Sequence, residues 1–257
     1  YKKFIKKNKI DIIYTAPTVL ILLKNKLKKD DLKYVKNIFS VGEALQESIV
    51  EDYKKLNVDI IDTFWQTETG AIVIANIDKK KGALGKAIGV EATVKGGMIV
   101  IKKPWPSMMT GIYKHKKMYI DYFDGKWFKT YDLAEKKENH FYFSGRKDDM
   151  IKSSGERISP IEIESILLKH PLVQEVAVLG VPDKDRGELI KAVIVLDKSK
   201  EKKFKTKKTN NKEEKLKEEI SSFVKNNYAG HSYPKIVEFV KELPKGNSGK
   251  IIKSKLK

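Results

Sequence analysis

Short apolar runs and longer amphipathic stretches alternate along the first quarter of the chain. The apolar runs predict buried strands, at residues 10–14, 37–41 and 58–63. Residues 18–28 and 45–56 place apolar side chains every three or four positions, which predicts helices between these strands. Strands that alternate with helices favour a parallel α/β sheet, whose ligands bind beyond the carboxyl ends of the strands. Residues 41–43 and 63–69 follow such ends.

Two further regions follow, each with its own pattern. From Ala71 to Phe128 helical spacing disappears and short strands alternate with glycines, which indicates a small β-subdomain. After Glu162 the pattern predicts a helix to Lys169 and a second helix near residues 213–226. The strands expected in this last region lie at residues 175–181, 191–196 and 236–240. Together these elements predict a compact α+β domain of about 100 residues.

The predicted fold class is therefore α/β. Residues 1–147 are expected to form part of a parallel α/β large domain with a small β-subdomain. Residues 148–257 are expected to form a compact α+β C-terminal domain. Within it, Lys198–Lys215 is rich in lysine, threonine and asparagine and almost free of apolar residues, which predicts a solvated surface loop.

Lysine dominates the charge of the chain. Of 53 basic residues, against 34 acidic ones, all but Arg146, Arg157 and Arg186 are lysines, and the net charge is +19. The lysines are spread over every segment, so the pattern weighs against nucleic-acid binding as the main function. The chain has no cysteine, which excludes disulfides and thiolate chemistry. No apolar run reaches the roughly 18 residues of a membrane span, and residues 1–7 are too charged for a signal peptide. We therefore expect a cytoplasmic protein that binds no membrane.

Residues 131–164 bring several kinds of chemistry close together. Tyr131 and Asp132 precede an aromatic strand that runs into Ser144-Gly145-Arg146. Arg157 lies in a turn rich in Asp, Ser and Gly, and Ser159-Pro160-Ile161-Glu162 has the residues of a helix N-cap and capping box. Because lysine is the default cation of this chain, an arginine indicates a need for a planar fork that binds phosphate, carboxylate or ribose oxygens through two hydrogen bonds.

This stretch resembles the junction between the large and small domains of the adenylate-forming enzymes, in particular the AMP-forming acetyl-CoA synthetases. Three more segments resemble motifs of that family, in its order: Asp62–Gly70 (DTFWQTETG), Lys103–Met109 (KPWPSMM) and Leu243–Ile251 (LPKGNSGKI). Four ordered motifs span nearly the whole chain and are more specific than any one of them. The resemblance implies that acetate and ATP form an acyl-adenylate and pyrophosphate, and that CoA then takes the acyl group to give acetyl-CoA and AMP. It implies ATP, CoA and Mg²⁺ as cofactors.

The resemblance also assigns roles to individual residues. Lys250 would reach the carboxylate and the α-phosphate during adenylation, and Glu68 would help to hold Mg²⁺. Asp148 would be the hinge about which the mobile small domain turns, and Gly155 would lie beside the path of the CoA arm. The implied nucleotide-binding residues are Gly42, Glu43, Ala44, Asp62, Thr63, Phe64, Trp65, Gln66, Thr67, Asp132, Arg146 and Arg157. Gly246 departs from the family pattern, which has a threonine at this position.

The acyl pocket implied by the resemblance is small. Val41 and Trp65 would form two of its walls and leave room for about two carbons, although apolar walls discriminate by only about 1–3 kcal/mol per methylene. Acetate is therefore favoured over longer acids. A medium-chain or aryl acyl-CoA ligase shares most of the motifs and remains an alternative. A basic nucleic-acid-binding protein or a non-catalytic fragment is the alternative from another class.

One family motif has no counterpart in these 257 residues. In the family, a loop rich in glycine, serine and threonine wraps the ATP phosphates and lies upstream of the motifs quoted above. We therefore expect either the C-terminal part of a longer protein or a truncated chain, and in both cases no adenylate formation by these residues alone. The sequence does not predict an oligomeric state.

Overall fold

The computed structural model describes all residues except 25, 198–211, 229–231, 247–249 and 257. It divides the chain into two compact units, Tyr1–Ser144 and Gly145–Lys257. The sequence analysis placed this division between residues 147 and 148. Within the described residues no helix is long and apolar enough to cross a bilayer.

The three parallel strands of the first sheet of unit 1 lie where the hydrophobic pattern predicts them, but the first was wrongly predicted to be buried, because Ile12 is 53% and Tyr14 48% exposed. The strand order of this sheet is β1 (Ile12–Thr15), β2 (Asn37–Ser40), β3 (Asp59–Phe64), β4 (Ile74–Ala75) and β5 (Lys86–Ala87). The first three strands pair in parallel and the last two add antiparallel. Helix α1 (Lys2–Lys7) precedes the sheet, and the connections between the parallel strands contain α2 (Pro17–Lys24), the 3₁₀ helix η1 (Lys29–Leu32) and α3 (Glu47–Lys54). Tyr53 of α3 is fully buried in this core and donates its hydroxyl to the Leu20 carbonyl oxygen of α2 at 3.0 Å.

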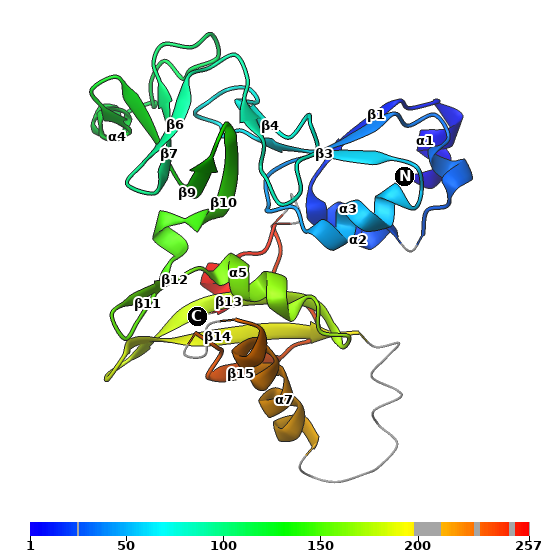
Figure 1. The fold of residues 1–257 in the computed structure, drawn as a ribbon, viewed down its shortest axis with the longest axis vertical. Coiled ribbons are helices and arrows are strands. Elements are labelled where there is room, and N and C mark those ends of the chain that lie inside the picture. The colour runs from blue at the N-terminus through cyan, green and yellow to red at the C-terminus, as the bar shows by residue number, and fades with distance from the viewer. Residues whose placement is uncertain (25, 198–211, 229–231, 247–249, 257) are drawn as a thin grey trace. The chain divides into compact units, whose positions relative to one another are not determined.

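The second sheet of unit 1 is the predicted β-subdomain. Its strands are β6 (Ala92–Lys95), β7 (Met98–Lys102), β8 (Phe123–Asp124), β9 (Trp127–Lys137) and β10 (His140–Arg146), in the order β10-β9-β7-β6 with β8 on β9 (Figure 1). The structure also has a helix here, α4 (Lys116–Asp121), in a region where the sequence analysis found no helical spacing. This helix buries none of its residues, so no apolar periodicity marks it.

A bulge interrupts β9 opposite β7. Between the cross-strand pairs Met98–Leu133 and Val100–Lys129, β7 contributes only Ile99 while β9 contributes residues 130–132. Tyr131, in the middle of the bulge, has a φ of +61°, which is a strained conformation for a bulky side chain. Bulges of this kind bend a strand and re-aim the side chains beside them.

Unit 2 is built around a long antiparallel hairpin. Its elements are η2 (Lys147–Asp149), β11 (Ile151–Ser153), β12 (Glu156–Ile158), α5 (Pro160–Leu167), β13 (Val173–Asp183), β14 (Gly187–Leu196), α7 (Lys212–Asn227), β15 (Ile236–Phe239) and η3 (Lys253–Leu256) (Figure 1). Residues along β13 alternate between two cores: Val176 and Val178 pack with α5 and α7, while Ala177 and Leu179 pack with Leu243. This alternation explains why the strand has a continuous apolar run.

Two details of unit 2 differ from the sequence analysis. The polar segment after Arg146, expected to be only a turn, contains the β11–β12 hairpin, in which Ser154 (φ +53°) and Gly155 (φ +83°) form a two-residue connection. Residues 212–215, the last of the lysine-rich tract, belong to α7 and not to a loop, whereas most of the tract lies outside the described residues. The helix start predicted at Ser159 is confirmed, because its hydroxyl oxygen accepts the Glu162 N–H at 3.5 Å.

Candidate active site

The turn after β3 is closed by Thr69. This threonine is fully buried, and its hydroxyl oxygen accepts the Gln66 backbone N–H at 2.9 Å. Gly70 follows with a φ of +71°, and a Cβ at this position would lie 2.1 Å from the Ser107 carbonyl oxygen. The close approach of the two backbones therefore requires glycine. The turn leaves Thr67 exposed and Glu68 half-buried.

The KPWPSMM segment packs directly on this turn. Trp105 Nε1 and Ser107 Oγ both donate to the Thr69 carbonyl oxygen, at 3.0 and 2.8 Å. The Met109 N–H donates to the Glu68 carbonyl oxygen at 3.1 Å. Two of the four motifs are thus parts of one hydrogen-bonded structure, although the sequence alone gave no reason to place them together.

Gln66 joins the same turn to the bulge of β9. Its Nε2 donates to the Thr130 carbonyl oxygen at 2.8 Å and to the Asp132 carboxylate. Asp132 is 4% exposed, and its backbone N–H donates to Thr130 Oγ1 at 3.1 Å. Thr130 Oγ1 in turn donates to the Ile99 carbonyl oxygen at 2.8 Å. The predicted ribose-binding residue is therefore held through its carboxylate by Gln66 and through its backbone by Thr130.

Glu68 and Asp62 lie in different electrostatic environments. Glu68 Oε1 accepts the Tyr122 hydroxyl at 3.1 Å, from the end of α4. Asp62 is buried at the end of β3, and burial raises its pKa to about 7, an effect that the Thr63 N–H and the Ser40 hydroxyl partly offset. Thr63 is also buried and donates its hydroxyl to the Ser40 carbonyl oxygen at 2.6 Å.

The loop after β2 is fixed through Glu43. Gly42 has a φ of +85°, and the Glu43 carboxylate accepts hydrogen bonds from the Thr18 N–H at 3.2 Å and its hydroxyl at 2.5 Å. Thr18 belongs to the first turn of α2, so Glu43 caps that helix. Val41 and Ala44, on either side, are half-buried.

The two aromatic residues of the DTFWQTETG motif differ in burial. Phe64 packs against the core of the β-subdomain. Trp65 is 37% exposed, so it is not simply a core side chain. An indole that keeps this much surface in unit 1 is available to contact a ligand.

The remaining predicted residues belong to unit 2. Arg146 ends β10 and is half-buried, Asp148 lies in η2, and Arg157 is exposed on β12. A Cβ on Gly155 would meet no atom within 4 Å, so its φ of +83° in the hairpin turn is the structural reason for glycine there. Lys250 is exposed, and its carbonyl oxygen accepts the Gly246 N–H at 2.8 Å beside a bridge between Lys245 and Ile251.

Several residues around these sites were missed by the sequence analysis. They are Thr18, Tyr122 and Thr130, each of which holds a predicted residue in place. Thr18 and Tyr122 carry no local signal of this role, because their partners Glu43 and Glu68 lie 25 and 54 positions away in the chain. Thr130 was the most accessible of them, since it stands two residues before the aspartate of a quoted motif.

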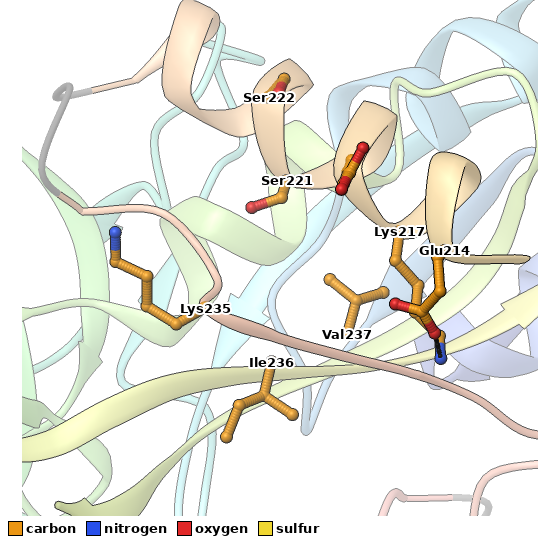
Figure 2. Close-up of a pocket in the computed structure, with 8 residues that line it drawn as sticks. Glu214, Lys217, Ser221, Ser222, Lys235, Ile236 and Val237 are labelled. Atoms are coloured by element: carbon orange, nitrogen blue, oxygen red, sulfur yellow. Dashed lines mark hydrogen bonds and ion pairs between the residues drawn. The ribbon is translucent and has the colours of Figure 1, made fainter. Parts of the chain in front are cut away.

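A cavity of about 400 Å³ lies elsewhere in unit 2, between α7 and β15. It is lined by Glu214, Lys217, Glu218, Ser221, Ser222, Lys235, Ile236 and Val237 (Figure 2). Lys217 pairs with Glu214 at 2.8 Å, and the Ser221 hydroxyl donates to the Pro234 carbonyl oxygen at 2.6 Å. Three of the polar lining residues are thus already engaged, and no residue predicted for the active site lines the cavity.

Comparison with protein families accounts for both units. Residues 1–111 match the family model of the AMP-binding enzymes, and residues 162–250 match the model of the AMP-binding enzyme C-terminal domain. The chain belongs to the adenylate-forming AMP-binding enzymes. The resemblance inferred from its motifs is thereby confirmed.

The curated relatives of this AMP-binding enzyme are about twice as long as the chain. Acetyl-coenzyme A synthetase of Bacillus subtilis is 40% identical over 270 residues, which cover 96% of this chain and 46% of that protein. Acetyl-coenzyme A synthetase of Methanothrix thermoacetophila is 34% identical, with coverage of 96% and 41%. The mitochondrial acyl-coenzyme A synthetase ACSM3 of Rattus norvegicus is 33% identical, with coverage of 96% and 45%.

Solved structures confirm the predicted fold class. The anthranilate CoA ligase AuaEII, in complex with anthranoyl-AMP, superposes with a TM-score of 0.82 at 30% identity, over 99% of this chain and 51% of that one. The benzoate CoA ligase of Burkholderia xenovorans LB400 superposes with a TM-score of 0.83 at 28% identity, over 98% and 52%.

Proposed function

We propose that this AMP-binding enzyme takes part in activating a short carboxylate, with acetate as the first candidate. In the proposed reaction ATP and the acid form an acyl-adenylate and pyrophosphate, and CoA then takes the acyl group and releases AMP. The observation that carries the proposal is the link from Gln66 to Asp132, which brings the DTFWQTETG turn to a buried carboxylate 66 positions along the chain. The exposed Thr67 of this turn is suited to a nucleotide phosphate, and the fixed Asp132 carboxylate is suited to a ribose.

The chemistry of adenylation depends mainly on positioning and on charge stabilisation at phosphorus. An ionised carboxylate only accepts hydrogen bonds, so Asp132 is suited to the two hydroxyls of a ribose. Glu43 keeps the Gly42 loop fixed on α2, so that its backbone can lie along an adenine. Thr67, which is exposed, would contact phosphate.

The residues present fit Mg²⁺ bound through the nucleotide. Among the described residues no group of three or more acidic or histidine side chains could hold a metal ion. Glu68 is thus a single carboxylate, and Mg²⁺ in nucleotide enzymes is commonly held by one or two carboxylates together with substrate phosphates and water. When bound, the ion would neutralise phosphate charge. Glu68 would hold it and is itself oriented by the Tyr122 hydroxyl.

Unit 2 supplies the cations of the proposed reaction. Arg157 would meet the nucleotide phosphate with a planar fork, and Lys250 would place its ammonium near the carboxylate and the α-phosphate. The backbone bonds around Lys250 fix the base of its loop and leave the side chain exposed. Asp148 in η2 is the proposed hinge, and Gly155 is proposed to lie beside CoA.

The choice of acid is the least constrained part of the proposal. Two of the relatives above are named acetyl-coenzyme A synthetases, and they include the one at 40% identity, which supports acetate. The anthranilate and benzoate CoA ligases support the aryl form of the alternative, a medium-chain or aryl acyl-CoA ligase, and the name of ACSM3 specifies only an acyl group. Trp65 and Val41 are the proposed walls that decide between them. The cytoplasmic location stays a prediction from the sequence.

The test is ATP–pyrophosphate exchange by the protein that the complete gene encodes. Exchange is measured with acetate, propionate, hexanoate and benzoate at equal concentration. The proposal predicts exchange that requires an acid and is fastest with acetate. Fastest exchange with hexanoate or benzoate would establish the alternative, and the absence of exchange with every acid would contradict the proposed function.

A further inference from the structure

The side-chain nitrogen of Gln66 faces two hydrogen-bond acceptors. Nε2 lies 2.8 Å from the Thr130 carbonyl oxygen and also donates to the Asp132 carboxylate. An amide nitrogen carries two N–H donors, so both are used. If the amide were flipped, its oxygen would face two other oxygen atoms and could form no hydrogen bond with either. The hydrogen-bond partners therefore fix the amide in the orientation described.

The orientation of the amide leaves its oxygen without a donor. Gln66 Oε1 is buried and has no hydrogen-bond partner among the residues that the structure describes. A buried polar atom without a partner is destabilising and is uncommon in folded proteins. The amide thus keeps both of its donors on Thr130 and Asp132 although this leaves its oxygen unpaired.

The backbone next to Asp132 has an unusual conformation. The bulge at residues 130–132 carries Tyr131 at a φ of +61°, and the Asp132 N–H turns to Thr130 Oγ1 at 3.1 Å within its own strand. Strained backbone persists only where its surroundings determine it, and it is concentrated at functional sites. Backbone strain and the Gln66 amide are independent observations, and both act on Asp132.

We propose that Gln66 is a positioning residue that orients the Asp132 carboxylate for the two hydroxyls of the nucleotide's ribose. The inference deepens the proposed function and depends on it for the identity of the ligand. A donor from the amide stabilises the ionised, acceptor-only form of the carboxylate and fixes its rotation. Replacing Gln66 removes this donor from the Asp132 carboxylate.

The test compares binding of AMP and of 2′,3′-dideoxy-AMP by calorimetry. Dideoxy-AMP lacks the hydroxyls that Asp132 would bind, so the ratio of the two dissociation constants isolates the ribose contact. The wild-type protein should prefer AMP, and Gln66→Leu should reduce that preference about tenfold or more, the effect expected of a hydrogen bond to a charged group. Unchanged preference, or an equal loss of affinity for both nucleotides, would overturn the inference.

Gln66→Glu provides a second variant of nearly the same shape. At neutral pH the introduced carboxylate would repel Asp132 and remove the preference for AMP. At acidic pH the introduced side chain becomes protonated and regains one O–H donor, so the preference should partly return. A preference that is independent of pH in this variant would count against positioning, even if Gln66→Leu fails to fold.

Pyrophosphate exchange separates this inference from the proposed function. If exchange requires an acid but the preference for AMP over dideoxy-AMP is the same with and without Gln66, the positioning role is refuted and the proposed function is not. If exchange is absent but replacing Gln66 reduces the preference for AMP over dideoxy-AMP, the proposed function is refuted and the positioning role is not. A wild-type protein that binds both nucleotides equally would overturn the inference outright.

Discussion

Replacing Gly70 by alanine should destabilise unit 1 through a clash between two motifs. At a φ of +71° an alanine already costs about 1–2 kcal/mol, because its Cβ approaches the backbone. In this structure the added Cβ would also lie 2.1 Å from the Ser107 carbonyl oxygen, so one of the two backbones must move. Overpacking of this kind costs about 1–3 kcal/mol more. We therefore expect a loss of about 2–5 kcal/mol in the free energy of unfolding.

Gly82 offers a matched control for this substitution. Its φ is +70°, nearly the same as that of Gly70, but a Cβ there would meet no atom within 4 Å. Gly82→Ala should therefore cost only the backbone part, about 1–2 kcal/mol. The difference between the two variants measures the contact between the DTFWQTETG and KPWPSMM motifs.

Tryptophan fluorescence in urea can follow unit 1 alone. All three tryptophans, Trp65, Trp105 and Trp127, lie in residues 1–144. Gly70→Ala should lower the transition midpoint more than Gly82→Ala, and it should also weaken AMP binding because Gln66 and Thr69 lie in the displaced turn. Equal midpoints for the two variants would refute the packing of these motifs on one another.

Three further predictions concern single residues. Trp65→Gly should shift the preference in pyrophosphate exchange from acetate toward longer acids, by roughly 10–200-fold per methylene accommodated, and an unchanged acid profile would make Trp65 purely structural. Lys250→Ala should slow adenylation about 10²–10³-fold and spare thioester formation from supplied acetyl-adenylate, whereas equal loss of both half-reactions would contradict its proposed role. For Asp62, the folded pKa of about 7 exceeds the unfolded value of 3.8, so the folded state binds more protons between about pH 4 and 7. Stability should therefore fall as pH rises through this window, by up to roughly 4 kcal/mol, and Asp62→Asn should remove that slope in urea titrations at a series of pH values.

The sequence predicted the elements that bury a regular apolar face. Strands β2 and β3 and the strands of the C-terminal hairpin were visible as apolar runs. Strand β1 was located in the same way although it is only partly buried, and the helix start at Ser159 was marked by its capping residues. Helix α4 was missed because none of its residues is buried, and the β11–β12 hairpin was missed because its strands are only three residues long. Elements that are short or fully exposed to solvent have too few buried apolar residues to give a detectable periodic pattern.

The candidate site shows the same limit at the level of side chains. Motifs identified Gln66 and Asp132 separately, but no spacing in the chain indicates that one binds the other. The bulge at Tyr131 was equally invisible, since a tyrosine in a strand gives no sign of a positive φ. These features depend on which strands lie together in the fold, and the contact that fixes Asp132 follows from that arrangement.

Acetate-dependent ATP–pyrophosphate exchange tests the central claim most directly. The protein encoded by the complete gene is assayed with Mg²⁺, with and without acetate, beside an otherwise identical Lys250→Ala variant. The account predicts exchange that requires acetate and falls at least about 100-fold in the variant. Exchange that continues without any carboxylic acid, or no exchange by the wild-type protein with any acid, would contradict it.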